Sequence, residues 1–181
     1  MKSVKYYLKH PEKAIEYFYI MYYRTIESGN TYSYLIDYLT RREFFTKPCS
    51  RKHHLACKHG LLIHSVLVCQ FGLELIQKYK LPISENSFII ASLLHDVCKC
   101  EDDYKEHGHR SVQIISRFIY LTELEKEMIT WHMGVYSEYY DNLQPGDFLK
   151  WSSDWKNTDK NAAIFLYMCD HFSTMFLEGE K

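Results

Sequence analysis

The chain has 181 residues, of which 46% are apolar and 25% charged; this is typical of one globular domain and excludes an extended disordered protein. Its 22 basic and 23 acidic side chains give a formal net charge of −1, which argues against a strongly basic nucleic-acid-binding protein. No apolar run reaches the roughly 18 residues that a membrane helix needs. The N-terminus also lacks the apolar stretch of a signal peptide. We therefore expect a cytoplasmic protein with no membrane partner.

Helices are expected throughout, because apolar residues recur three and four positions apart and only seven glycines and four prolines interrupt the chain. Pro11 suits the first position of a helix. Thr122 and Glu125 form a capping box that opens another. In chain order, the pattern predicts helices at about 11–28, 32–45, 60–79, 84–97, 109–120, 122–134 and 157–177. The segments 48–59 and 135–157 are predicted loops.

The sequence shows no strand alternation and no internal repeat, so it predicts an all-α fold, a compact single-domain bundle of about seven helices. We expect residues 1–40 to be an N-terminal helical extension of a main domain over residues 41–181. The tyrosines of the extension stand among few cations. Packing or a homodimer contact therefore explains them better than stacking on nucleic-acid bases. The six cysteines form no Cys-x-x-Cys pair and are expected to be reduced.

Ionisable groups interrupt the apolar runs of three predicted helices: His64, the pair His95 and Asp96, and Asp170. An unpartnered buried carboxylate is costly or takes up a proton. Any one of these groups alone is more simply satisfied by a backbone carbonyl, a helix cap or a lysine. The joint pattern instead favours one divalent ion shared by two imidazoles and two carboxylates.

This order of residues resembles the HD-domain superfamily of metal-dependent phosphohydrolases. Further segments between about residues 40 and 175 resemble a bacterial and phage subgroup of that superfamily: 44–50, 53–54, 60–65, 93–99, 107–111 and 131–134. The chain departs from the subgroup at His59, where a glycine is usual, and at Ile63, where an acidic residue is usual. Both residues flank the helix of the first ligand and leave the ligands themselves unchanged.

The resemblance implies that the metal ligands are His64, His95, Asp96 and Asp170. These donors suit Mn, Fe, Ni, Zn or Mg and do not choose among them. His107 and His132 match positions that supply a second metal in binuclear members, or else they contact substrate, so one or two ions are expected per chain. Lys99 is expected to hold a phosphate oxygen or Asp96. His54 is either a residue that contacts substrate or an ordinary loop histidine.

The implied activity is hydrolysis of a phosphate ester by metal-activated water, with Asp96, Lys99, His107 and His132 as catalytic residues. The expected substrate is a phosphorylated small molecule, nucleotide-like or otherwise. No glycine-rich phosphate loop is present. Two alternatives remain open: a non-catalytic HD-fold binding module, and an accessory protein of nucleic-acid processing. The second would use the basic residues near the site: Lys47, Arg51, Lys52 and Lys58.

Overall fold

The structure is a computed structural model that describes residues 1–25, 31–101, 107–136, 150, 153 and 158–178. Those residues form eight α-helices and no strand, which confirms the all-α prediction. The α-helices are α1 (Val4–Lys9), α2 (Pro11–Arg24), α3 (Thr31–Arg41), α4 (Gly60–Tyr79), α5 (Glu85–Leu94), α6 (His107–Ile115), α7 (Glu123–Trp131) and α10 (Thr158–Phe172). Three short helical turns accompany them: η1 (Val97–Glu101), η2 (Gly134–Tyr136) and, after α10, η3 (Ser173–Leu177).

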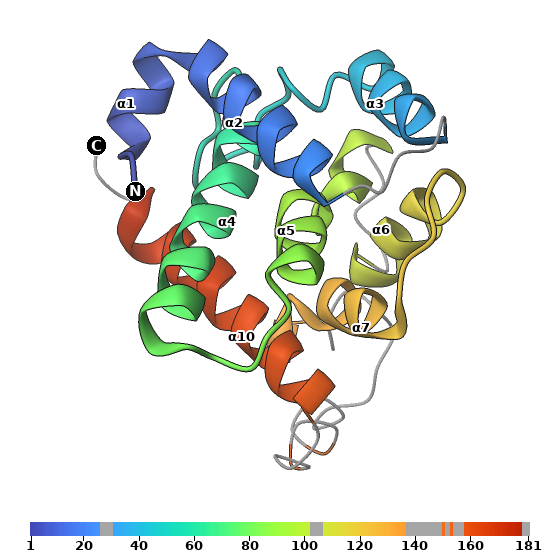
Figure 1. Cartoon of the computed structure of the whole chain (residues 1–181). Helices are drawn as coiled ribbons and strands as arrows, with labels where there is room; N and C mark the ends of the chain where they lie inside the picture. The colour runs from blue at the N-terminus through green and yellow to red at the C-terminus, as the bar shows by residue number, and fades with distance from the viewer. Residues whose placement is uncertain (26–30, 102–106, 137–149, 151–152, 154–157, 179–181) are drawn as a thin grey trace.

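Helices α4 and α5 pack against each other at the centre of the molecule (Figure 1). Helix α2 contacts both of them from above in this view, α10 contacts both from below, and α7 contacts α5. Leu61, Leu62, Ile63, Val66 and Leu67 succeed one another along α4 and are all fully buried. A helix that is apolar on every side belongs inside a protein. The central position of α4 thus follows from its sequence.

Helix α4 is also long and apolar enough to cross a membrane, the single helix of the described ranges that passes this test. The finding is weak evidence for a span, because 78% of the apolar stretch is buried inside the protein. The stretch also contains His64, Ser65 and Gln70, so it is no continuous apolar run.

Local signals in the sequence explain several helix ends. The Thr122 hydroxyl accepts a hydrogen bond from the Glu125 backbone N–H and the Glu125 carboxylate accepts one from the Thr122 N–H, which confirms the predicted capping box. Gly60 opens α4 where a Cβ would lie 2.0 Å from the Leu55 carbonyl oxygen. Only glycine allows segment 48–59 to approach α4 this closely. That segment forms one wall of the cavity described below.

Other helix ends differ from the prediction. Helix α1, capped by the Ser3 hydroxyl, was not expected. The helix expected at 84–97 ends at Leu94, and a 3-10 turn follows. Helix α6 begins at His107, ahead of Gly108, and ends at Ile115. The expected helix at 157–177 stops at Phe172 and continues as a π-helical turn.

The helices predicted at 11–28 and 32–45 are shorter, ending at Arg24 and Arg41. Residues 26–28 and most of the predicted loop 135–157 lie outside the described residues.

Several aromatic residues of the first forty positions join the core. Phe18 is fully buried; its ring stacks on Tyr22 and meets Phe44 and Phe45 edge-on or tilted, with centroids 5.2–5.8 Å apart. These residues belong to the same apolar cluster as α4 and α5. The division at residue 40 into an extension and a domain remains a prediction.

Candidate metal centre

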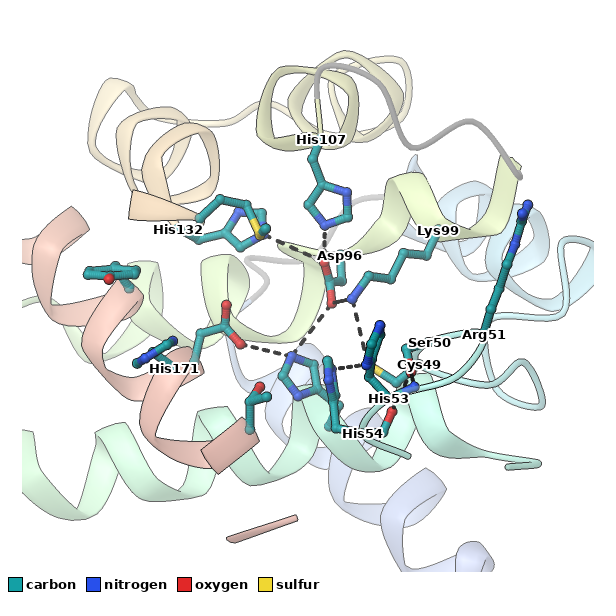
Figure 2. A pocket seen from close by; sticks show the side chains of 15 residues that line it. Cys49, Ser50, Arg51, His53, His54, Asp96, Lys99, His107, His132 and His171 are labelled. Carbon is teal, nitrogen blue, oxygen red and sulfur yellow. Dashed lines mark hydrogen bonds and ion pairs between the residues drawn. The ribbon is translucent and has the colours of Figure 1, made fainter. Parts of the chain in front are cut away.

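Five helices bring the predicted ligands to one place. His64 comes from α4, the pair His95 and Asp96 follows the end of α5, His107 opens α6, and His132 caps the end of α7. Asp170 comes from α10. All of them except Asp170 are at most 3% exposed. In Figure 2, His107 and His132 lie on one side of Asp96 and the loop with His54 lies on the other.

The distances divide the cluster into two overlapping parts. In the first, the Nε2 atom of His64 lies 3.1 Å from His95 Nε2, 3.1 Å from Asp170 Oδ1 and 3.5 Å from Asp96 Oδ2. In the second, Asp96 Oδ1 lies 2.6 Å from His107 Nε2 and 3.6 Å from His132 Nε2. Asp96 therefore links the two parts through its two oxygens.

Three groups with metal-ligand geometry result. Each consists of side chains whose donor atoms lie within 4.8 Å of one another: His64, His95 and Asp96; His95, His132 and Asp170; and Asp96, His107 and His132. Asp96 and Asp170 fall in different groups, and His64 and His95 lie close to both carboxylates. The buried His and Asp groups could thus hold a metal ion.

Hydrogen bonds on the far side of each ring fix three of the imidazoles. The Nδ1–H groups of His95 and His132 donate to the carbonyls of Ser92 and Ile129, at 2.8 Å and 2.6 Å. His64 donates its Nδ1–H to the Glu178 carboxylate at 2.7 Å. These bonds direct each Nε2 atom into the cluster. Metal-ligating histidines are oriented in the same way.

The facing nitrogen atoms of His64 and His95 test whether the site suits a cation. With both Nδ1–H groups donated, two Nε2 atoms 3.1 Å apart are compatible only if a proton or a metal ion lies against them. Two nitrogens at this separation can each lie about 2.1 Å from one ion. His132 Nε2 is buried and has no hydrogen-bond partner. Such an orphaned nitrogen is expected where a cation completes the site.

Lys99 is the main counter-charge inside the cluster. Its Nζ atom donates to Asp96 Oδ2 at 2.5 Å, from one helical turn further along the chain. Burial alone would raise the pKa of Asp96, but the Lys99 ammonium and the His95 imidazole hold it well below its usual range. Burial would lower the pKa of Lys99, and Asp96 raises it well above its usual value. Both groups are therefore ionised.

Histidine pKa values in the cluster move in opposite directions. Burial lowers those of His95 and His107. For His64 burial acts the same way, but Cys49 and Glu178 raise the pKa well above its usual value. Burial also opposes ionisation of Asp170, and its hydrogen bond to His64 outweighs that effect and lowers its pKa.

Cys49 and His54 form a fourth group with His64. The Cys49 sulfur lies 3.3 Å from His54 Nε2, and Lys99 donates to it at 3.6 Å. Burial raises the pKa of the Cys49 thiol to about 11. Both His64 nitrogens already serve the main cluster, through Glu178 on one side and the other ligands on the opposite side. The Cys49 group therefore shares His64 with the main cluster and is not a separate site.

A cavity of about 360 Å³ opens onto this cluster. His64, Asp96, Asp170 and Lys99 line it. Figure 2 shows Lys99 beside Asp96. The predicted residue His54 lines the cavity, together with Arg51 and His53 from the same loop. Tyr167 and His171 of α10 line the other side, with ring centroids 5.8 Å apart. The cavity therefore gives a small molecule direct access to the candidate ligands.

Two of the other basic residues near the site have partners outside the cluster of candidate ligands. Lys47 donates to the Cys100 carbonyl at 3.1 Å. Arg110 forms an ion pair with Glu101 at 2.7 Å. Lys52 and Lys58 do not line the cavity.

Three residues at the site were not anticipated as such. Glu178 holds His64, Cys98 lies behind His107 with its sulfur 3.1 Å from His107 Nδ1, and Cys49 faces Lys99. Glu178 lies 114 positions from His64. No local pattern in the sequence indicates such a contact. All six cysteines are free in the structure.

Comparisons with known proteins add no further identification: no family model, no curated protein and no solved structure matches this chain.

Proposed function

We propose that this protein is a metal-dependent phosphohydrolase of the HD type, which cleaves a phosphate ester of a small molecule. One observation carries the proposal: three buried imidazoles, each fixed through Nδ1, direct Nε2 toward Asp96 and Asp170, which line an open cavity. Ligands of this kind suit divalent ions that act on phosphate esters. The ligand residues are His64, His95, Asp96 and Asp170, joined by His107 and His132 where a second ion binds.

A divalent ion held there supplies Lewis acidity toward a phosphoryl oxygen and lowers the pKa of bound water. Asp96 accepts a hydrogen bond from the attacking water and so orients it. Lys99 stands beside Asp96 at the cavity wall and offsets negative charge that develops on the phosphoryl oxygens. His107 and His132 serve the same purpose from the opposite side of Asp96 when they are not metal ligands.

The cavity supports a small phosphorylated substrate. Its volume of about 360 Å³ lies near the lower end of the range for small-molecule sites. Arg51, His53 and His54 provide cationic or hydrogen-bonding groups on one wall, and Tyr167 provides an aromatic surface on the other. A nucleotide-like compound, with an anionic and a planar part, meets both walls.

The test is a panel of phosphomonoesters, cyclic nucleotides and short oligonucleotides, each with added Mn, Mg, Ni or Zn. We expect metal-dependent hydrolysis by the wild type and by the control Asp37→Asn, since Asp37 is an exposed residue of α3. Asp170→Asn is expected to reduce the rate to the uncatalysed background. A metal-replete wild type that hydrolyses none of these compounds would contradict the enzyme and favour a binding module. Salt-sensitive binding of single strands without hydrolysis would favour a nucleic-acid accessory role.

A further inference from the structure

His64 differs from the other two oriented histidines in where its Nδ1–H bond goes. His95 and His132 stand at helix ends and donate to carbonyls three residues back, which the end of a helix leaves available. His64 lies inside α4, where backbone carbonyls accept the N–H groups of the following turn. An acceptor for His64 Nδ1 must therefore come from another element.

Glu178 supplies that acceptor from the far end of the chain. Its Oε1 atom lies 2.7 Å from His64 Nδ1, and the two side chains are 0% and 1% exposed. On the other side of the same ring, Asp170 Oδ1 lies 3.1 Å from Nε2. The two carboxylates of the C-terminal segment thus bracket one imidazole.

The π-helical turn η3 accounts for this placement. Asp170 and Glu178 are eight positions apart, whereas two turns of α-helix take about 7.2 residues. A π turn contains more residues than an α turn. The Glu178 N–H donates to the Ser173 carbonyl five residues back, at 3.0 Å, which is the π pattern. The wider turn rotates Glu178 back toward the face of Asp170, and a π turn in such a place is often connected with function.

We propose that Glu178 is a positioning residue for the metal centre. Its carboxylate holds the His64 ring so that Nε2 faces the ion. The hydrogen bond at Nδ1 also makes Nε2 a stronger electron-pair donor to the ion. The inference rests on the proposed function, because it assumes that an ion binds at His64. Loss of such an outer carboxylate typically weakens metal binding by about 10- to 100-fold.

A purely structural role makes a different prediction from a positioning role. Glu178→Gln keeps the size of the side chain and an amide oxygen that accepts from Nδ1. Glu178→Ala removes the acceptor. A role in packing alone would change thermal stability in Glu178→Ala and leave the metal affinity of the folded protein unchanged. Glu123→Ala is the matched control, because Glu123 is 80% exposed and belongs to α7.

The experiment titrates the full-length, metal-free proteins with Co²⁺, whose visible absorption bands report binding. Absence of a sulfur-to-cobalt charge-transfer band excludes binding through Cys49. In parallel, NMR of ¹⁵N-histidine-labelled protein follows the His64 Nδ1–H proton. We expect Glu178→Ala to lose this signal and to bind Co²⁺ about 10- to 100-fold more weakly. Glu178→Gln should retain the signal and bind more tightly than Glu178→Ala, and Glu123→Ala should match the wild type.

Co²⁺ affinity of folded Glu178→Ala within twofold of the wild type would overturn the positioning role. So would an affinity of Glu178→Gln that falls as far as that of Glu178→Ala, since the retained acceptor must rescue binding. Either result, in a wild type that binds metal and hydrolyses esters, leaves the proposed function intact. A wild type that binds no divalent ion refutes the proposed function itself, and the role of Glu178 with it.

Discussion

Asp96→Asn tests the electrostatic account of the cluster in the metal-free protein. The substitution keeps the shape of the side chain and removes the counter-charge of Lys99, whose ammonium lies 2.5 Å from Asp96 Oδ2. Removing one partner of a buried ion pair costs about 3–5 kcal/mol. The Lys99 side chain retains 13% exposure and can reach water in part, so the lower limit of about 3 kcal/mol applies.

The assay is thermal unfolding in the presence of a chelator, which removes any contribution of bound metal. For a chain of this length a loss of 1 kcal/mol lowers Tm by about 2–4 °C, so Asp96→Asn should lower it by about 6–12 °C. Adding Lys99→Met removes the uncompensated ammonium and should restore most of the loss. The exposed pair of Glu123 and Lys126 serves as a control, and Glu123→Gln should cost less than about 1 kcal/mol.

The reasoning is refuted if Asp96→Asn unfolds within about 1 kcal/mol of the wild type under these conditions. It is also refuted if the double variant is no more stable than Asp96→Asn alone. Either result would mean that Lys99 is not a buried partner of Asp96 in solution.

Three further predictions concern single residues. Where the wild type binds two ions, His132→Ala should lower the metal content to one per chain by elemental analysis, because the orphaned Nε2 of His132 belongs to two of the ligand groups. Unchanged metal together with lost activity would assign His132 to substrate. Gly72→Ala should destabilise the protein by about 1–3 kcal/mol in urea unfolding, because a Cβ there would lie 2.1 Å from the buried Phe88 ring. A gain in stability from better helix propensity would instead show that the Phe88 ring moves aside. Thr122→Ala should cost about 1 kcal/mol in the same assay through loss of the N-cap of α7, and no change would show that the capping box is not formed in solution.

Sequence patterns sufficed where the determinants of structure are local. Helix α4 spans the predicted residues 60–79, because a mainly apolar pattern begins at Gly60 and the helix ends shortly before Pro82. The capping box at Thr122 was likewise evident from residues three positions apart. The four candidate ligands could be singled out because polar groups in apolar helices need partners, and the structure places their side chains close together.

The remaining features depend on contacts between distant segments. Helix α5 ends at Leu94, although the apolar pattern continues to Val97. The chain turns at this point, and the turn places His95 and Asp96 in the cluster. The π turn after Phe172 and the buried Glu178 depend on the packing of the C-terminal segment against α4. Neither the order of polar and apolar residues nor the helical period contains information on such a turn.

The metal content of the purified protein, measured by elemental analysis after identical loading of the wild type and His95→Ala, tests the central claim most directly. We predict at least one divalent ion per chain in the wild type and none above background in His95→Ala, with helical content preserved. Equal metal content in the two proteins, or a wild type that retains no Mn, Fe, Ni, Zn or Mg, would contradict the account.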